Sequence, residues 1–99
     1  MLIRIVKMTF DPSKTEDFRS IYNTTHEKIR NVSGCRLLEL YQDSNDSSIF
    51  MTYSYWESEE ALERYRKSEL FRTTWAKTKL LFSKKPEAWS LKKMDNNNE

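Results

Sequence analysis

Three segments of this chain predict β-strands with apolar side chains on both faces. One face of residues 2–10 carries Leu2, Val6, Met8 and Phe10, interrupted by Arg4, and the other carries Ile3, Ile5, Lys7 and Thr9. Residues 35–42 and 48–56 show the same pattern. In the first of these segments, one face carries Cys35, Leu37 and Tyr41 and the other carries Leu38 and Leu40. In the second, one face carries Ile49, Met51, Tyr53 and Tyr55 and the other carries Phe50, Thr52, Ser54 and Trp56. An open antiparallel sheet normally keeps one face polar, because water covers that face. A sheet of these strands therefore needs cover on both faces.

Helical patterns separate the strands. Apolar residues recur at three- and four-residue steps up to about Asn31, after a start at which Asp11 and Ser13 are alternative N-caps. A second helical region begins after Ser58, restarts near Lys67-Ser68 and continues at helical spacing to Phe82. A last strand over residues 87–94 completes the order β-α-β-β-α-β. This order predicts an α+β, ferredoxin-like fold: a four-stranded antiparallel sheet with both helices on one face.

We expect one domain over residues 1–94 and a polar C-terminal tail over residues 95–99. The helices cover one face of the sheet and leave the other bare. A monomer seldom exposes so large an apolar surface, and two-fold homodimers are the commonest assemblies. We therefore expect a homodimer that pairs through the sheet face.

Scarce residue types exclude several functions. The 99 residues contain one glycine, one cysteine and one histidine, so glycine-rich phosphate loops, disulfides and cysteine zinc clusters are excluded, and we expect no metal. A net charge of +2 argues against nucleic acid as a partner. The sequence contains neither a long apolar span nor a signal-peptide pattern at its start. We expect no membrane association and a cytoplasmic location.

Three motifs resemble one known family. They are Gly34-Cys35-Arg36-Leu37-Leu38-Glu39-Leu40, Tyr55-Trp56-Glu57-Ser58-Glu59-Glu60-Ala61-Leu62 and Ser68-Glu69-Leu70-Phe71. In this order and spacing they resemble the antibiotic biosynthesis monooxygenase, or quinol monooxygenase-like, family over about residues 1–92. The resemblance implies a dimeric α+β barrel with a small-molecule pocket between sheet and helices in each protomer. It also implies oxidation of aromatic polyketides or quinols by O2 without a cofactor in some members, and haem degradation or isomerisation in others.

The chain departs from the family pattern at four positions. Members often carry Glu at the position of Ser54 and His at that of Tyr65. Haem-degrading members place an axial His where this chain has Trp75, and Asn near Lys7. Without that His the iron has no evident ligand, so the departures argue against haem binding or degradation.

His26 and Trp56 are the candidate catalytic residues. His26 is the only side chain whose ordinary pKa suits proton transfer near neutrality, so it is a candidate general base; alternatively it is a boundary histidine bonded to a neighbour or to water. The indole N–H of Trp56 is a candidate donor to a substrate oxygen; alternatively the residue is a core anchor at the turn from strand to helix.

Four further residues are candidates for substrate binding. A hydroxyl of Thr52 or Tyr53 would stabilise a developing oxyanion. Tyr65 and Trp75 would wall the pocket, but they lie ten residues apart and converge only if the helix breaks near Ser68. Their alternative role is ordinary core packing.

Two functions remain open from the sequence. The first is a cofactor-independent monooxygenase that oxidises a small aromatic or quinol-type molecule with O2 inside a dry aromatic pocket. The second is a non-catalytic dimeric module that binds a small apolar or aromatic ligand in the same pocket.

Overall fold

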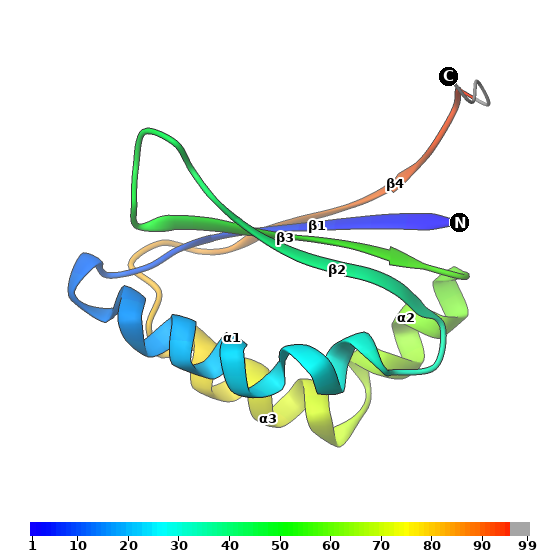
Figure 1. Cartoon of the computed structure of the whole chain (residues 1–99), viewed down its shortest axis with the longest axis horizontal. Helices are drawn as coiled ribbons and strands as arrows, with labels where there is room; N and C mark the ends of the chain where they lie inside the picture. Colours follow the sequence, from blue (N-terminus) through cyan, green and yellow to red (C-terminus); the bar gives the residue numbers. More distant parts are fainter. Residues whose placement is uncertain (96–99) are drawn as a thin grey trace.

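The computed structural model describes residues 1–95. Its sheet contains β1 (Leu2–Thr9), β2 (Cys35–Gln42), β3 (Ile49–Trp56) and β4 (Glu87–Lys92). The strands are antiparallel in the order β2-β3-β1-β4, and the helices lie on one side of them (Figure 1). This arrangement confirms the expected α+β, ferredoxin-like fold. Of the expected tail, only Asp95 falls inside the described residues.

The first helical region has two parts. A 3-10 turn, η1 (Pro12–Lys14), precedes the helix α1 (Thr15–Arg30). Oδ1 of Asp11 accepts hydrogen bonds from the backbone N–H of Ser13 at 2.9 Å and from its hydroxyl at 2.8 Å. Asp11 is therefore the residue that caps this region, because its carboxylate takes the free donors at the start of the turn.

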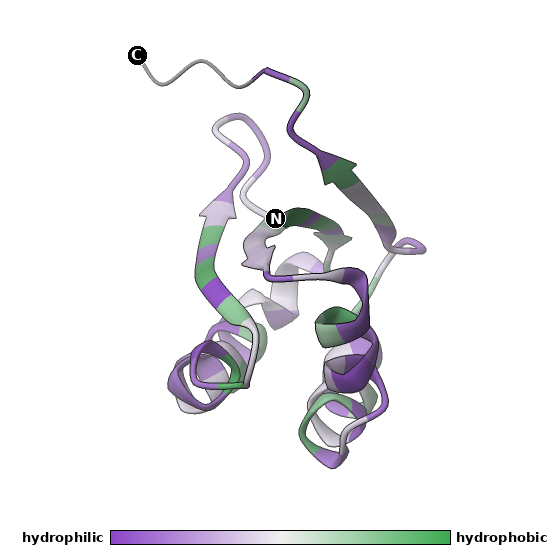
Figure 2. Cartoon of the chain, turned by 90° about the vertical axis from the view of Figure 1, so that its right-hand side faces the viewer, coloured by the Kyte–Doolittle hydropathy of each residue, from purple (hydrophilic) through white to green (hydrophobic). Residues whose placement is uncertain are grey.

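The second helical region breaks in the middle. Helix α2 (Glu59–Arg66) and helix α3 (Glu69–Lys79) meet at Ser68. The Ser68 hydroxyl donates to the carbonyl oxygen of Tyr65 at 2.6 Å and accepts from the N–H of Phe71 at 3.2 Å. One side chain thus ends α2 and caps α3, which fixes the bend between them. Seen along the helices, α1 forms one row and α2 with α3 another on the same side of the sheet (Figure 2).

Two expected boundaries were too long. Helix α3 ends at Lys79 and does not reach Phe82, because the backbone of Phe82 bridges to Phe10 at the end of β1. Strand β4 ends at Lys92 rather than at residue 94, because Lys92 already pairs with Leu2, the first residue of β1. In each case a partner segment determines where the element ends.

A bulge at the start of β2 changes the face on which Cys35 lies. The expectation grouped Cys35 with Leu37 and Tyr41, but the pairing with β3 shifts register between Cys35 and Leu37. A bulge adds one residue and so inverts the alternation of faces. Cys35 therefore points to the helix side, where it is buried beside Trp56 and Leu38.

Two buried clusters hold the helices against the sheet. One cluster joins α2 to the end of the sheet where Leu2, Cys35 and Trp56 lie side by side, and it also contains Ala61 and Leu62. The other joins the opposite end to α1 and contains Met8, Phe10, Phe18 and Phe50. The cavity described below lies between these two clusters, against the middle of the sheet.

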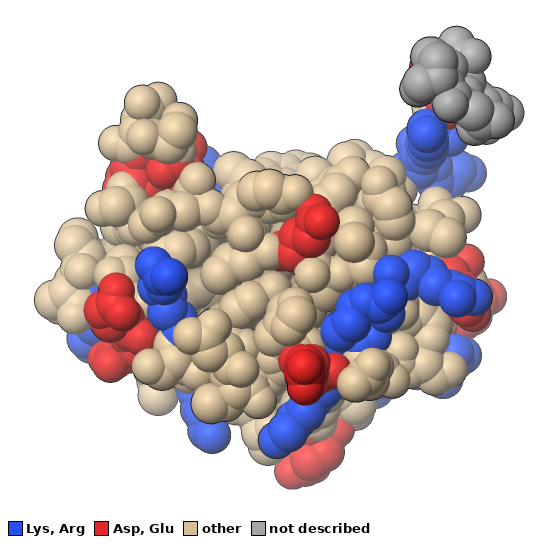
Figure 3. All heavy atoms as spheres, in the orientation of Figure 1, with Lys and Arg blue, Asp and Glu red and all other residues tan. Residues whose placement is uncertain are grey.

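Within residues 1–95 no helix covers the other face of the sheet (Figure 1). On that face Ile5 of β1 pairs with Tyr53 of β3 and Trp89 of β4. Trp89 remains 43% exposed and Leu91 44% exposed. Figure 3 views the molecule from the same side as Figure 1, with the helix-free face along its upper edge, and shows positive and negative side chains interspersed with uncharged surface on this side. The two-sided apolar pattern of the strands therefore leaves an unpaired apolar sheet face.

Candidate functional site

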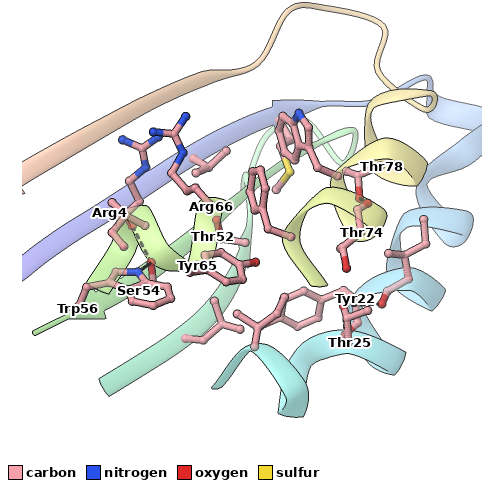
Figure 4. A pocket seen from close by; sticks show the side chains of 18 of the residues that line it. Arg4, Tyr22, Thr25, Thr52, Ser54, Trp56, Tyr65, Arg66, Thr74 and Thr78 are labelled. Atoms are coloured by element: carbon pink, nitrogen blue, oxygen red, sulfur yellow. Dashed lines mark hydrogen bonds between the residues drawn. The ribbon is translucent and has the colours of Figure 1, made fainter. Parts of the chain in front are cut away.

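A cavity of about 260 Å³ lies between the sheet and the helices. Strand residues form its roof and residues of α1, α2 and α3 form its other walls (Figure 4). Its apolar lining includes Val6, Met8, Phe18, Ile21, Leu38 and Phe71. A partly open cavity with mostly apolar walls and a few polar groups is typical of a small-molecule site.

A continuous row of aromatic rings forms one wall. Trp56 stacks on Tyr65 with ring centroids 5.1 Å apart, and Tyr65 meets Phe71 edge-on at 5.3 Å. Phe71 then stacks on Trp75 at 5.8 Å with an angle of 11° between the ring planes. Tyr65 and Trp75 lie ten residues apart, and they line the same wall because the helix breaks at Ser68 between them. A wall built of aromatic rings suits a planar aromatic ligand.

The indole N–H of Trp56 is not free to bind a ligand. Trp56 is 1% exposed, and its Nε1 donates to Oγ of Ser54 at 3.0 Å. The Ser54 hydroxyl in turn lies 3.4 Å from the carbonyl oxygen of Arg4, to which it donates. Trp56 therefore lines the cavity with its ring, while its single donor is satisfied inside the protein.

Hydroxyl groups supply one part of the polar lining. Thr52, Tyr22 and Tyr65 line the cavity, and within residues 1–95 their hydroxyls form no hydrogen bond to protein. Burial, with a smaller contribution from the negative charge of Glu39, raises the pKa of Tyr22 to about 12. Burial also raises the pKa of Tyr65. Both phenols are therefore neutral near pH 7 and act as hydrogen-bond donors.

Two of the six candidate residues lie outside the lining. The ring of His26 lies one helical turn beyond Tyr22, with ring centroids 5.1 Å apart, and does not reach the cavity wall. Tyr53 lies on the helix-free face, where its hydroxyl is 3.1 Å from that of Tyr55. The structure thus brings Thr52, Trp56, Tyr65 and Trp75 together and separates His26 and Tyr53 from them.

The sequence analysis missed two arginines. Arg4 and Arg66 both line the cavity, from β1 and from the last residue of α2 (Figure 4). A signal for Arg4 was present, because this residue interrupts the inward apolar face of the first strand between Leu2 and Val6. Nothing in the local pattern marked Arg66, since its position depends on the bend that follows it.

Among residues 1–95, no three His, Cys, Asp or Glu side chains converge as a metal site would require. None of the described helices combines the length and apolar composition needed to cross a bilayer.

The fold and the cavity define a ferredoxin-like α+β domain with an aromatic small-molecule pocket between sheet and helices. The chain belongs to the antibiotic biosynthesis monooxygenase family, whose model matches residues 1–77. This match confirms the resemblance found in the three sequence motifs. None of the curated proteins matches the chain in sequence.

Solved structures share the fold. A conserved protein from Methanosarcina mazei Go1 has a TM-score of 0.88 and 22% identity, over 94% of this chain and 93% of that chain. An antibiotic biosynthesis monooxygenase has a TM-score of 0.90 and 19% identity, over 96% of this chain and 100% of that chain. The protein PA3566 from Pseudomonas aeruginosa has a TM-score of 0.84 and 24% identity, over 95% and 94% of the two chains. At these identities the likeness shows the fold alone.

Proposed function

We propose that this chain is a cofactor-independent monooxygenase that oxidises a small aromatic or quinol-type molecule with O2. The observation that carries the proposal is the cavity, whose stacked aromatic wall and neutral hydroxyls suit a flat phenolic substrate. Membership of the antibiotic biosynthesis monooxygenase family supports the same chemistry.

The proposed reaction needs no external reductant. A hydroquinone and O2 give a hydroxyquinone and one water, and an anthrone and O2 give an anthraquinone and one water. One oxygen atom enters the substrate and the other leaves as water, so the substrate supplies all four electrons. The protein's part is to hold substrate and O2 together, exclude bulk water and favour the ionised, electron-rich form of the substrate.

The four candidate residues that line the cavity each have a defined part in this proposal. The rings of Trp56 on β3 and Trp75 on α3 bound the space in which the planar substrate lies. Thr52 and Tyr65 donate hydrogen bonds to the oxyanion that develops as the substrate ionises. Tyr65 can do so because its phenol is protonated near pH 7, and burial, which raises its pKa, keeps it protonated at higher pH as well.

His26 remains the proposed general base. Neither Tyr22 nor Tyr65 is ionised near neutral pH, and the other titratable groups of the lining are Arg4 and Arg66. The His26 ring lies beyond Tyr22 and outside the lining, so we propose that the substrate proton reaches it through a bound water at the α1 side of the cavity.

Oxygen consumption tests the proposal. Hydroquinones and anthrones are supplied to the native protein, to His26→Ala and to the control Glu27→Gln, which changes an exposed neighbour on α1. We expect one O2 consumed per substrate, no hydrogen peroxide, and a slower rate in His26→Ala alone. No rate above that of the protein-free solution, or peroxide equal to the O2 consumed, contradicts the proposal. Ligand binding without turnover would favour the non-catalytic module.

We also propose that the chain is a homodimer in which the helix-free sheet faces pack together. The apolar face with exposed Trp89 and Leu91 supports this arrangement, because water would otherwise contact it. A second copy of the same face supplies matching apolar surface around a two-fold axis.

A further inference from the structure

The cavity is apolar along most of its wall but carries two positive charges at one end. Arg4 extends from β1 and Arg66 from the end of α2, and both side chains reach toward the same end, away from Tyr22 and Thr25 (Figure 4). Arg4 is half-buried, and Arg66 has 44% of its side chain exposed, which places Arg66 at the mouth.

The two guanidiniums are only partly compensated. Arg66 pairs with Glu63 at 3.1 Å. Within residues 1–95 Arg4 forms no ion pair, and its guanidinium donates to the neutral hydroxyl of Ser90 at 2.9 Å. Two positive charges therefore face one negative charge, and the group carries a net charge of +1 beside an apolar cavity.

This arrangement is costly in the absence of a ligand. Burial and the nearby Arg66 both lower the pKa of Arg4, while Glu63 raises it. Removing a guanidinium from water beside a second one is unfavourable unless an anion is available to both. An arginine on an inward strand face is thus poorly explained by packing alone.

We propose that Arg4 and Arg66 form an anion subsite that binds the carboxylate of an aromatic substrate whose rings lie in the cavity. The inference rests on the proposed function for the aromatic part of the ligand. A planar guanidinium donates two parallel hydrogen bonds to a carboxylate, and this geometry orients the ligand as well as holding it. The net charge of +1 matches a carboxylate monoanion better than a phosphate dianion.

This subsite would also fix which end of the substrate meets the hydroxyls. A carboxylate at Arg4 and Arg66 directs the ring system inward, past the Trp56–Tyr65 stack and toward Trp75. The substrate class is then a hydroxylated aromatic carboxylic acid of about two fused rings, which the cavity of about 260 Å³ accommodates.

Calorimetric titration with 2-naphthoate and its neutral counterpart 2-naphthamide tests the subsite without any turnover. We expect the native protein to bind the naphthoate about tenfold or more tightly than the amide, because charge-assisted hydrogen bonds form only with the acid. Arg4→Gln and Arg66→Gln should each reduce that preference, and Arg4→Lys should retain part of it. The control Arg72→Gln removes an arginine that is paired with Glu69 on α3 outside the lining, and should keep the preference intact.

A second variant acts in the opposite direction. Glu63→Gln releases Arg66 and removes the one negative charge of the group, so naphthoate should bind more tightly while naphthamide is unchanged. A merely structural role of the arginines would not produce this gain. Competition by inorganic phosphate equal to that by benzoate would overturn the assignment to a carboxylate.

The outcomes separate this inference from the proposed function. Equal affinity for acid and amide, or equal effects of Arg4→Gln and Arg72→Gln, overturns the anion subsite even if neutral hydroquinones are oxidised. A clear preference for the acid that depends on Arg4, together with no oxygen consumption on any substrate, supports the subsite and contradicts the monooxygenase.

Discussion

Nε1 of Trp56 donates a hydrogen bond to Oγ of Ser54, at 3.0 Å, from a position two residues further along the same face of β3. The small hydroxyl of Ser54 is thus the acceptor for the only donor of the indole ring. The pair is buried, with Ser54 6% and Trp56 1% exposed. Trp56 therefore acts through its ring surface, and Ser54 fixes the orientation of that ring against Tyr65.

Ser54→Ala should destabilise the protein. The change leaves the Trp56 N–H buried without an acceptor, which costs about 1–3 kcal/mol. Urea unfolding followed by tryptophan fluorescence measures the loss. Ser20→Ala on the exposed side of α1 is the matched control and should lower stability little or not at all. Equal stabilities of the two variants would mean that the indole finds another acceptor.

Gly34→Ala should destabilise the turn between α1 and β2. Gly34 has φ +92°, and a Cβ at this position would lie 2.5 Å from Cβ of Ala61. Overpacking of this kind costs about 1–3 kcal/mol, and the positive φ adds backbone strain. The double variant Gly34→Ala with Ala61→Gly removes the overlap and keeps the strain. Thermal unfolding of Ala61→Gly alone measures the separate cost of that change. After this cost is subtracted, the stability of the double variant should lie between that of the native protein and that of Gly34→Ala.

The homodimer predicts a specific response to charge on the helix-free face. Ile5 lies on the central strand β1 of that face, between Tyr53 and Trp89. Ile5→Arg would bury a charge in the interface, so sedimentation at micromolar concentration should show a dimer for the native chain and a monomer for the variant. Ala76→Arg adds the same charge at an exposed position of α3 and should stay dimeric. A monomeric native chain would contradict the prediction.

Alkaline pH should weaken the fold partly through Tyr22. Burial raises the pKa of Tyr22 from 10.0 to about 12, so the folded state favours the neutral phenol. The associated stabilisation is complete below pH 10 and is lost as the pH rises through about 12. Between these values the free energy of unfolding should fall less steeply in Tyr22→Phe than in the native protein. Parallel curves for the two proteins, or the same tyrosinate absorbance at each pH, would contradict this expectation.

Strand pattern and element order were enough to predict the fold, because two-sided apolar strands and helical spacing are local properties. The break at Ser68 was predictable for the same reason, since the apolar pattern visibly restarts there. The ends of the helices and strands were harder to predict from the sequence. Strand β4 ends opposite Leu2, the first residue of β1, whereas helix α3 ends just before the bridge between Phe82 and Phe10 at the other end of β1. Both ends depend on pairing between distant segments.

The candidate site was predicted only in part. Thr52, Trp56, Tyr65 and Trp75 line one cavity because strand alternation and the helix break place them there. Tyr53 belongs to the other face by that same alternation, and His26 lies at the edge of the α1 stripe, one turn outside the wall. Arg66 could not be found from local sequence, because its position depends on the bend that follows it.

Strand β4 pairs with β1 alone, and all six of its residues are exposed. Ser90, on the helix side of this edge strand, bonds the Arg4 guanidinium. Because so little packing secures it, β4 should separate from its neighbour at a lower free energy than the buried clusters do. Opening of this one edge would free the Arg4 guanidinium from Ser90, while the aromatic wall and the rest of the sheet stay assembled.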